Sequence, residues 1–300
     1  MEWNMPSSRK RRQINRPLRH LKELPFWKGT EFRTFLHYIS IVVMHDVMNT
    51  EEFNHFLCYF ISITTFSSKV HQSLWPLGEN LMREFVRNFG HFYGKGNLTS
   101  NVHNLQHIYQ EVLQFGSLDN FSSYCFENHL QYIKQSVRCG SKCIEQVITR
   151  SHEMSLIDSL VKAYPAKYPK LMQNGKQLFI SSDFVLLPNV ANQWFLTQQN
   201  GIVKFLGAKK CHTDSFILSG MQFDNVSELF QHRISSTELY IFEVNKTESS
   251  HYVEIPLNLV KCKLVAIFLP THSLYHPSMQ TRPLETVAFF PLLHTFQNNQ

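Results

Sequence analysis

The sharpest chemical signal in the sequence is an acid and a base that share one predicted helix. That helix is expected after the polar stretch Ser117–Ser123, with Phe126, Leu130, Ile133 and Val137 on one side. Glu127 and Lys134 are seven residues apart, which is two helical turns, so they project from nearly the same face. Taken alone, such a pair is either a solvent-exposed acid and base or part of a functional site.

Two further pairs have spacings that can bind zinc. His103 and His107 are four residues apart on one predicted helix, and Cys139 and Cys143 have a ligand-like gap. The competing interpretation of the histidines is structural: partly buried rings that hydrogen-bond the neighbouring turn. Both interpretations of the pairs remain open at this point.

A helical half is expected to position these residues. Apolar residues at helical spacing and capping residues predict helices over about 30–47, 51–66, 76–93, 101–115, 124–137 and 144–153. Gly116 supplies a stop and a turn, because glycine tolerates a positive φ, and Phe115 and Phe121 can anchor both ends of that turn. The pattern predicts an all-helical domain over about residues 26–155.

The character of the sequence then changes to short runs rich in β-branched and aromatic residues. Two prolines in Tyr164–Pro169 predict a linker over 156–174, and a short helix is expected at Leu229–Ser236. Turn signals separate the runs, which predicts a small antiparallel sheet or barrel over 175–296. The predicted strands are 178–180, 184–187, 193–197, 202–206, 215–218, 239–244, 252–255, 263–268 and 286–290. The fold class is therefore expected to be α+β.

Composition limits the class of protein. The 300 residues are 43% hydrophobic, which is ample for a core, yet they contain no run of eighteen apolar residues that would predict a membrane span. The N-terminus lacks the apolar segment of a signal peptide, so a nuclear or cytoplasmic protein without membrane partners is expected. Six cysteines in a chain of this length do not suggest a disulfide framework.

Residues 1–25 form a predicted basic arm. Seven of the 29 Lys and Arg residues lie between Arg9 and Lys22, and the densest run is Arg9, Lys10, Arg11 and Arg12. Such a run is typical of a nuclear-localisation signal or of a segment that contacts DNA phosphates. The sequence contains no nucleophile elbow, phosphate-binding loop or dinucleotide fingerprint, which leaves those enzyme classes without support.

Four motifs in a fixed order suggest a family. They are Trp27-Lys-Gly-Thr-Glu-Phe-Arg33, Asn101-Val-His-Asn-Leu-Gln-His107, Phe115-Gly-Ser-Leu-Asp-Asn-Phe-Ser122 and Phe126-Glu-Asn128. Together they resemble the C-terminal half of CACTA (EnSpm-type) DNA transposases. The resemblance covers residues 16–155 closely and the strand-rich region more loosely.

The resemblance implies roles for particular residues. Transposases of the DDE class hold two metal ions with two aspartates on an RNase H-like sheet and a third acid on a helix. Many of them place a Lys or Arg seven residues after that acid. By resemblance, Glu127 is the candidate third acid and metal ligand, Lys134 the candidate contact to the DNA backbone, and Glu31 the second candidate acid.

The expected function follows from what the chain lacks. An upstream region with the first two aspartates is absent, and one carboxylate does not build a two-metal site. The chain is therefore expected to be a transposase-derived remnant, inactive alone and without a cofactor, that binds DNA or protein in the nucleus. The alternative is the C-terminal part of a transposase that completes a magnesium-dependent phosphodiester-transfer site together with a missing upstream half.

Overall fold

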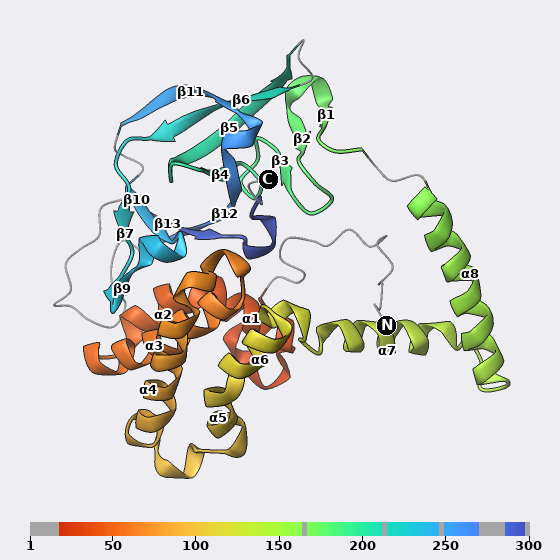
Figure 1. The fold of residues 1–300 in the computed structure, drawn as a ribbon, viewed down its shortest axis with the longest axis horizontal. Coiled ribbons are helices and arrows are strands. Elements are labelled where there is room, and N and C mark those ends of the chain that lie inside the picture. Colours follow the sequence, from red (N-terminus) through yellow and green to blue (C-terminus); the bar gives the residue numbers. More distant parts are fainter. Residues whose placement is uncertain (1–17, 164–166, 212–214, 246–248, 270–285, 298–300) are drawn as a thin grey trace.

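The structure is a computed structural model that describes residues 18–163, 167–211, 215–245, 249–269 and 286–297. Its N-terminal region is helical and its C-terminal region is an antiparallel β structure, so the predicted α+β class is confirmed (Figure 1). The α-helices are α1 (Gly29–Thr34), α2 (Ser40–Val47), α3 (Thr50–Phe66), α4 (Trp75–Tyr93), α5 (Ser100–Asn104), α6 (Ile108–Phe115), α7 (Tyr124–Ser136) and α8 (Cys143–Ala163).

The β region is built around one large antiparallel sheet. Its strand order is β11-β6-β5-β4-β12-β13-β10-β7, and smaller sheets are formed by β1-β2-β3 and β8-β9. The strands are β1 (Lys170–Met172), β2 (Gln177–Phe179), β3 (Val185–Leu186), β4 (Trp194–Thr197), β5 (Ile202–Lys210), β6 (Phe216–Phe223), β7 (Ser227–Glu228), β8 (Gln231–His232), β9 (Ile234–Ser235), β10 (Phe242–Asn245), β11 (Ser250–Pro256), β12 (Val260–Phe268) and β13 (Thr286–Pro291).

Helices α3 and α4 form the centre of the helical region. The Asn49 side chain caps α3 by accepting from the Glu52 amide at 3.0 Å. The Ser62 hydroxyl of α3 donates to the Gly78 carbonyl of α4 at 2.8 Å. A Cβ at Gly78 would lie 2.7 Å from the Thr65 hydroxyl, so this position must lack a side chain for the two helices to approach so closely.

The largest core is shared by the helical and β regions. Side chains of α2, α3 and α4 pack in one cluster with Leu239, Ile241, Ala288 and Phe290 from the β region. Phe60 of α3, which is fully buried, meets Phe230 edge-on with ring centroids 5.9 Å apart. The two halves that differ in sequence character therefore fold against each other.

Most predicted elements lie where the sequence pattern places them. Each of the predicted strand runs overlaps an observed strand, and each predicted helix overlaps observed helical structure, although α8 extends ten residues beyond the predicted end at 153. The predicted helix at Leu229–Ser236 is wrong. Arg233 has φ 61° there and forms the tip of the β8–β9 hairpin, with His232 opposite Ile234.

The predicted linker also differs from the structure. Helix α8 continues through residues 156–163, which the prediction assigned to the linker, and β1 begins at Lys170. Because a residue that precedes proline is disfavoured in the helical conformation, the helix can run as far as Ala163, directly before Tyr164-Pro165. The helix ends at Ala163, and residues 164–166 of the predicted linker lie outside the described residues.

Helices α7 and α8, which we call the arm, extend to one side of the rest of the chain (Figure 1). They contact each other, and the Tyr132 hydroxyl of α7 donates to the Arg150 carbonyl of α8 at 3.0 Å. At its base, α7 begins at Tyr124, whose ring packs against Gly29 of α1. The arm is therefore attached to the helical region at its first residue.

The shared core predicts that the helical and β regions unfold together. Replacing the fully buried Leu239 with Ala should lower the free energy of unfolding by about 2–5 kcal/mol, because it leaves a cavity between the two regions. Thermal unfolding followed by circular dichroism at helix and strand wavelengths checks this. Leu113→Ala, at a side chain that is 59% exposed, is the control and should change the free energy of unfolding by less than ~0.5 kcal/mol. Separate transitions for the two regions would contradict the prediction.

Candidate functional site

Two motifs that are far apart in the sequence meet in the structure. Arg33, from the motif at 27–33, forms a 2.7 Å ion pair with Asp119, from the motif at 115–122. The Arg33 guanidinium also lies over the Tyr124 ring, 5.9 Å from its centroid. A Cβ at Gly29 would lie 3.1 Å from Tyr124, so the ring packs tightly against the α1 backbone. We call this cluster the motif junction.

The turn on one side of the junction has the predicted form. Gly116 has φ 86°, which a residue with a side chain rarely adopts, and the side-chain Nδ2 of Asn120 donates to the Phe115 carbonyl at 2.9 Å. The rings of Phe115 and Phe121 are 5.9 Å apart, so they hold the two ends of the turn together as expected. This turn places Asp119 against Arg33.

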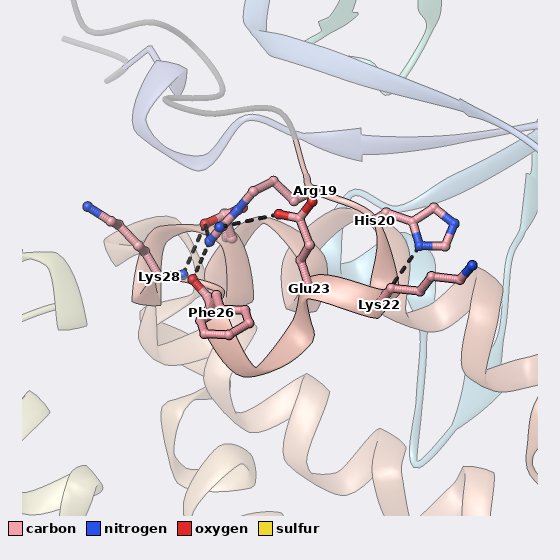
Figure 2. A network of polar contacts seen from close by, with 7 residues as sticks. Arg19, His20, Lys22, Glu23, Phe26 and Lys28 are labelled. Atoms are coloured by element: carbon pink, nitrogen blue, oxygen red, sulfur yellow. Dashed lines mark hydrogen bonds and ion pairs between the residues drawn. The ribbon is translucent and has the colours of Figure 1, made fainter.

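Glu31 lies beside the junction as a fully buried side chain. The Arg19 guanidinium donates to both of its oxygens, at 2.8 and 2.9 Å, and the Lys28 amide donates to one of them at 3.0 Å (Figure 2). Arg19 also contacts Glu23 and the Phe26 carbonyl. The hydrogen bonds from Arg19 lower the pKa of Glu31 to about 2.

These contacts correct the assignment of Glu31 as a second candidate catalytic acid. Both oxygens are engaged by donors in a buried site, and the carboxylate also caps α1 through the Lys28 amide. The side chain is therefore a structural ion-pair partner and not an open metal ligand. Arg19 comes from the basic N-terminal segment predicted over residues 1–25. The 3-10 helix Leu21–Phe26 begins within that segment.

Glu127 and Lys134 occupy the first and last turns of α7, and both are exposed. Because α7 is continuous between them, their predicted position on nearly one face is retained. Glu127 lies in the first turn of α7 together with Tyr124 of the motif junction. Burial raises the pKa of Tyr124, the Arg33 charge opposes this, and the charges of Glu127 and Asp119 add to it. Asp119 is already paired with Arg33, which leaves Glu127 as the accessible candidate acid of this cluster.

The predicted zinc ligands are not joined by further ligands in the described part of the chain. The rings of His103 and His107 lie 5.8 Å apart, and the Gln106 amide lies 3.1 Å from His103. Cys143 directs its thiol to the Cys139 carbonyl at 3.7 Å. Among the described residues, no three His, Cys, Asp or Glu side chains are placed to share a metal ion. Within the part of the chain that the structure describes, each pair therefore has no third protein ligand of a zinc site.

The candidate phosphate contacts in the N-terminal run, Arg9, Lys10, Arg11 and Arg12, lie outside the described residues. Lys134 is the member of the predicted DNA-backbone set whose surroundings the structure shows. It is followed by Arg138 and Lys142, which are also exposed, around the bend between α7 and α8. These three are the charged residues between Glu127 and Glu145.

The arm also exposes large apolar side chains, among them two that the sequence pattern placed on one side of the predicted α7 helix. Phe126 and Leu130 of α7 are 68% and 64% exposed, and Ile144 and Ile148 of α8 are 74% and 62% exposed. Helical spacing predicts which residues share a face, but it does not predict whether another element covers that face. No sequence signal distinguishes this row from a core row.

A second feature that sequence reasoning missed is a buried lysine in the β region. Lys263 of β12 is 1% exposed, and its ammonium nitrogen donates to the Val185 carbonyl at 2.8 Å and to the Asn192 side-chain oxygen at 2.7 Å. Burial lowers its pKa to about 7. The contacts tie β12 to β3 through Val185 and to the segment after β3 through Asn192, so this lysine links the smaller sheet to the large one.

Comparison with protein-family models found a match, and it lies in the β region. Residues 166–284 match the model of a domain of unknown function (DUF8592). No curated protein and no solved structure matches the chain. Among the described helices, none is both long and apolar enough to cross a membrane. The matching domain family has no assigned activity. The matched residues lie outside the helical region on which the resemblance to transposases rests.

The buried ion pair predicts a pH dependence of stability. The pKa of Glu31 is about 2 in the folded chain and near 4.5 in the unfolded chain, so its stabilising effect is present above pH 4.5. We expect that effect to be lost as the pH falls from 4.5 toward 2, and Glu31→Gln to remove this part of the dependence. Urea midpoints of both proteins at a series of pH values check this. Parallel curves would contradict it.

The two candidate acids should respond differently to the same substitution. Glu127→Gln, at an exposed position, should leave the melting temperature unchanged, whereas Glu31→Gln should lower it by several degrees because it leaves the Arg19 charge without its carboxylate. Differential scanning fluorimetry at neutral pH measures both. A marked loss of stability in Glu127→Gln would instead indicate a structural role for that carboxylate.

Proposed function

We propose that this chain is a transposase-derived binding module without catalytic activity of its own, which engages a protein partner in the nucleus through the arm. The observation that carries the proposal is the exposure of the large apolar side chains on α7 and α8. Soluble proteins rarely leave a group of large apolar side chains uncovered unless it forms an interaction site.

The spacing of the exposed residues suits a helical partner. Phe126 and Leu130 are four residues apart on α7, and Ile144, Ile148 and Leu156 follow a four-residue row along α8. Rows at this spacing form the ridges that pack into the grooves of another helix. An amphipathic helix that lays its apolar face on such a surface is a recurrent mode of recognition.

The charges at the bend of the arm indicate the polar character of that partner. Lys134, Arg138 and Lys142 surround the bend and are exposed. No acidic residue lies between Glu127 and Glu145 to balance them. Complementary charge favours a partner helix that carries acidic residues beside its apolar face. The partner class proposed is therefore an acidic amphipathic helix.

The candidate acids support a binding role over catalysis by this chain alone. Glu31 is buried and paired with Arg19, and Asp119 is paired with Arg33, which leaves Glu127 as a single accessible carboxylate at the junction. One carboxylate does not hold two metal ions. The second candidate function, completion of a magnesium site with an upstream transposase half, is favoured by the exposed position of Glu127 on a continuous helix.

The binding proposal is tested with variants of the arm. Partners captured from nuclear extract by cross-linking are identified, purified and titrated against the full chain by isothermal calorimetry. Leu130→Lys and Ile148→Lys should each weaken binding at least tenfold, because each removes an apolar contact of roughly 1.5–3 kcal/mol. Leu113→Lys, at a leucine of α6 that is similarly exposed, is the matched control and should bind like the native chain.

Other results would replace the proposal. Binding of a 30-base-pair duplex that falls steeply with salt and is lost when Lys134, Arg138 and Lys142 are changed to Ala would indicate contact with the DNA backbone. Nicking of DNA that requires magnesium and an upstream transposase fragment, and that Glu127→Gln abolishes, would establish the second candidate function. If the Leu130→Lys and native proteins bind the partner equally well, the arm is not the binding surface.

A further inference from the structure

Strand β11 forms one edge of the large sheet, away from the arm (Figure 1). It is seven residues long and pairs with β6 over its whole length, whereas the strand at the opposite edge, β7, has two residues. Among the described residues, no strand pairs with the other side of β11. An edge of this length presents a row of backbone groups that another strand can pair with.

The register identifies which backbone groups face outward. The Asp224 amide donates to the Ser249 carbonyl at 3.2 Å, directly before the first β11 pair. Opposed residues in an antiparallel ladder alternate between bonded and non-bonded pairs, so Tyr252 and Glu254 direct their N–H and C=O groups away from β6. Pro256 is two residues after Glu254, so its backbone faces the same open side. A proline is tolerated there because its missing N–H is not needed for pairing with β6.

A hollow of about 330 Å³ lies on the sheet surface next to this edge. Leu206 and Ile217 line it from β5 and β6, and Tyr252 and Glu254, whose side chains share one face of β11, line it at the edge. Leu206 is 41% exposed and Tyr252 is 57% exposed. The hollow is thus an open site with a mixed lining, in which Leu206 and Ile217 supply apolar contacts and β11 supplies the edge.

The charges around the hollow favour one sign of ligand. Lys209 is paired with Glu254 through hydrogen bonds of 2.8 and 3.0 Å. Lys176 also lines the hollow, is exposed, and forms no ion pair within the described part of the chain. An incoming ligand therefore meets one uncompensated positive charge.

We propose that β11 is a strand-addition site for an extended peptide that places an apolar side chain in the hollow and an acidic side chain near Lys176. An extended backbone is the ligand that satisfies the outward groups of Tyr252 and Glu254 together, through the alternation that pairs strands. This site is separate from the arm, so its test does not depend on the binding module proposed above.

The probe is a phage-displayed library of random twelve-residue peptides, panned on the full chain. Enriched peptides should share an apolar residue and an acidic residue, and a synthetic copy should bind in fluorescence anisotropy. Glu254→Pro should weaken that binding about tenfold, because it removes an outward N–H that β6 does not use. The matched control, Glu254→Thr, also breaks the pair with Lys209 but keeps the amide, so it should weaken binding less than threefold.

A measurement on the native chain keeps the test independent of how the proline variant folds. In hydrogen exchange followed by NMR, the Tyr252 and Glu254 amides should exchange rapidly in the free chain and become protected when the peptide binds. Failure of the library to enrich any peptide, equal binding by Glu254→Pro, or unchanged exchange at both amides would overturn the proposal. A dimer in light scattering that Glu254→Pro dissociates would also overturn it, because a second copy would then occupy the edge.

Discussion

Helix α3 has buried side chains around most of its circumference, and eleven of its seventeen residues are buried. A helix of this kind must be covered from more than one direction. Helix α4 covers one side, and residues of the β region such as Phe230 cover another. The hydroxyls of Ser62 and Thr65 donate to carbonyl oxygens, which lets these polar residues enter the core without unpaired donors. The arrangement of both halves follows from this one requirement.

The motif junction shows how local and distant information combine. The turn at Gly116 could be predicted, because positive φ and the flanking phenylalanines are properties of a few adjacent residues. The burial of Glu31 could not, because it depends on Arg19, twelve residues earlier, in a segment that was expected to be a basic arm for localisation or phosphate contact. No local sequence pattern predicts that a charged side chain will be buried beside a partner of opposite charge. The contacts between these motifs give their residues a structural role, whichever family they resemble.

The elements of the β region were predictable to a greater extent than its surroundings. Runs of β-branched and aromatic residues are local signals, and each coincides with a strand. The β8–β9 hairpin was missed because Arg233 carries the turn without a glycine. The spacing of the α7 row predicted that its residues share one side of the helix, but their exposure is decided by which element packs nearby. Local sequence pattern thus predicts the helices of the arm but not the exposure of their apolar side chains, on which the binding proposal rests.

The position of β13 has a consequence for how the β region can be divided. This strand lies between β12 and β10 in the large sheet, and it carries Phe290 into the core shared with α3. The stretch that matches the family model ends at residue 284, directly before β13 begins. A fragment cut at those limits would lose the strand that joins two parts of the sheet, and it would open two new edges. The smallest independently folding unit around that stretch therefore extends beyond the family boundary, at its C-terminal side through β13 and at its N-terminal side to the helices that cover Phe290.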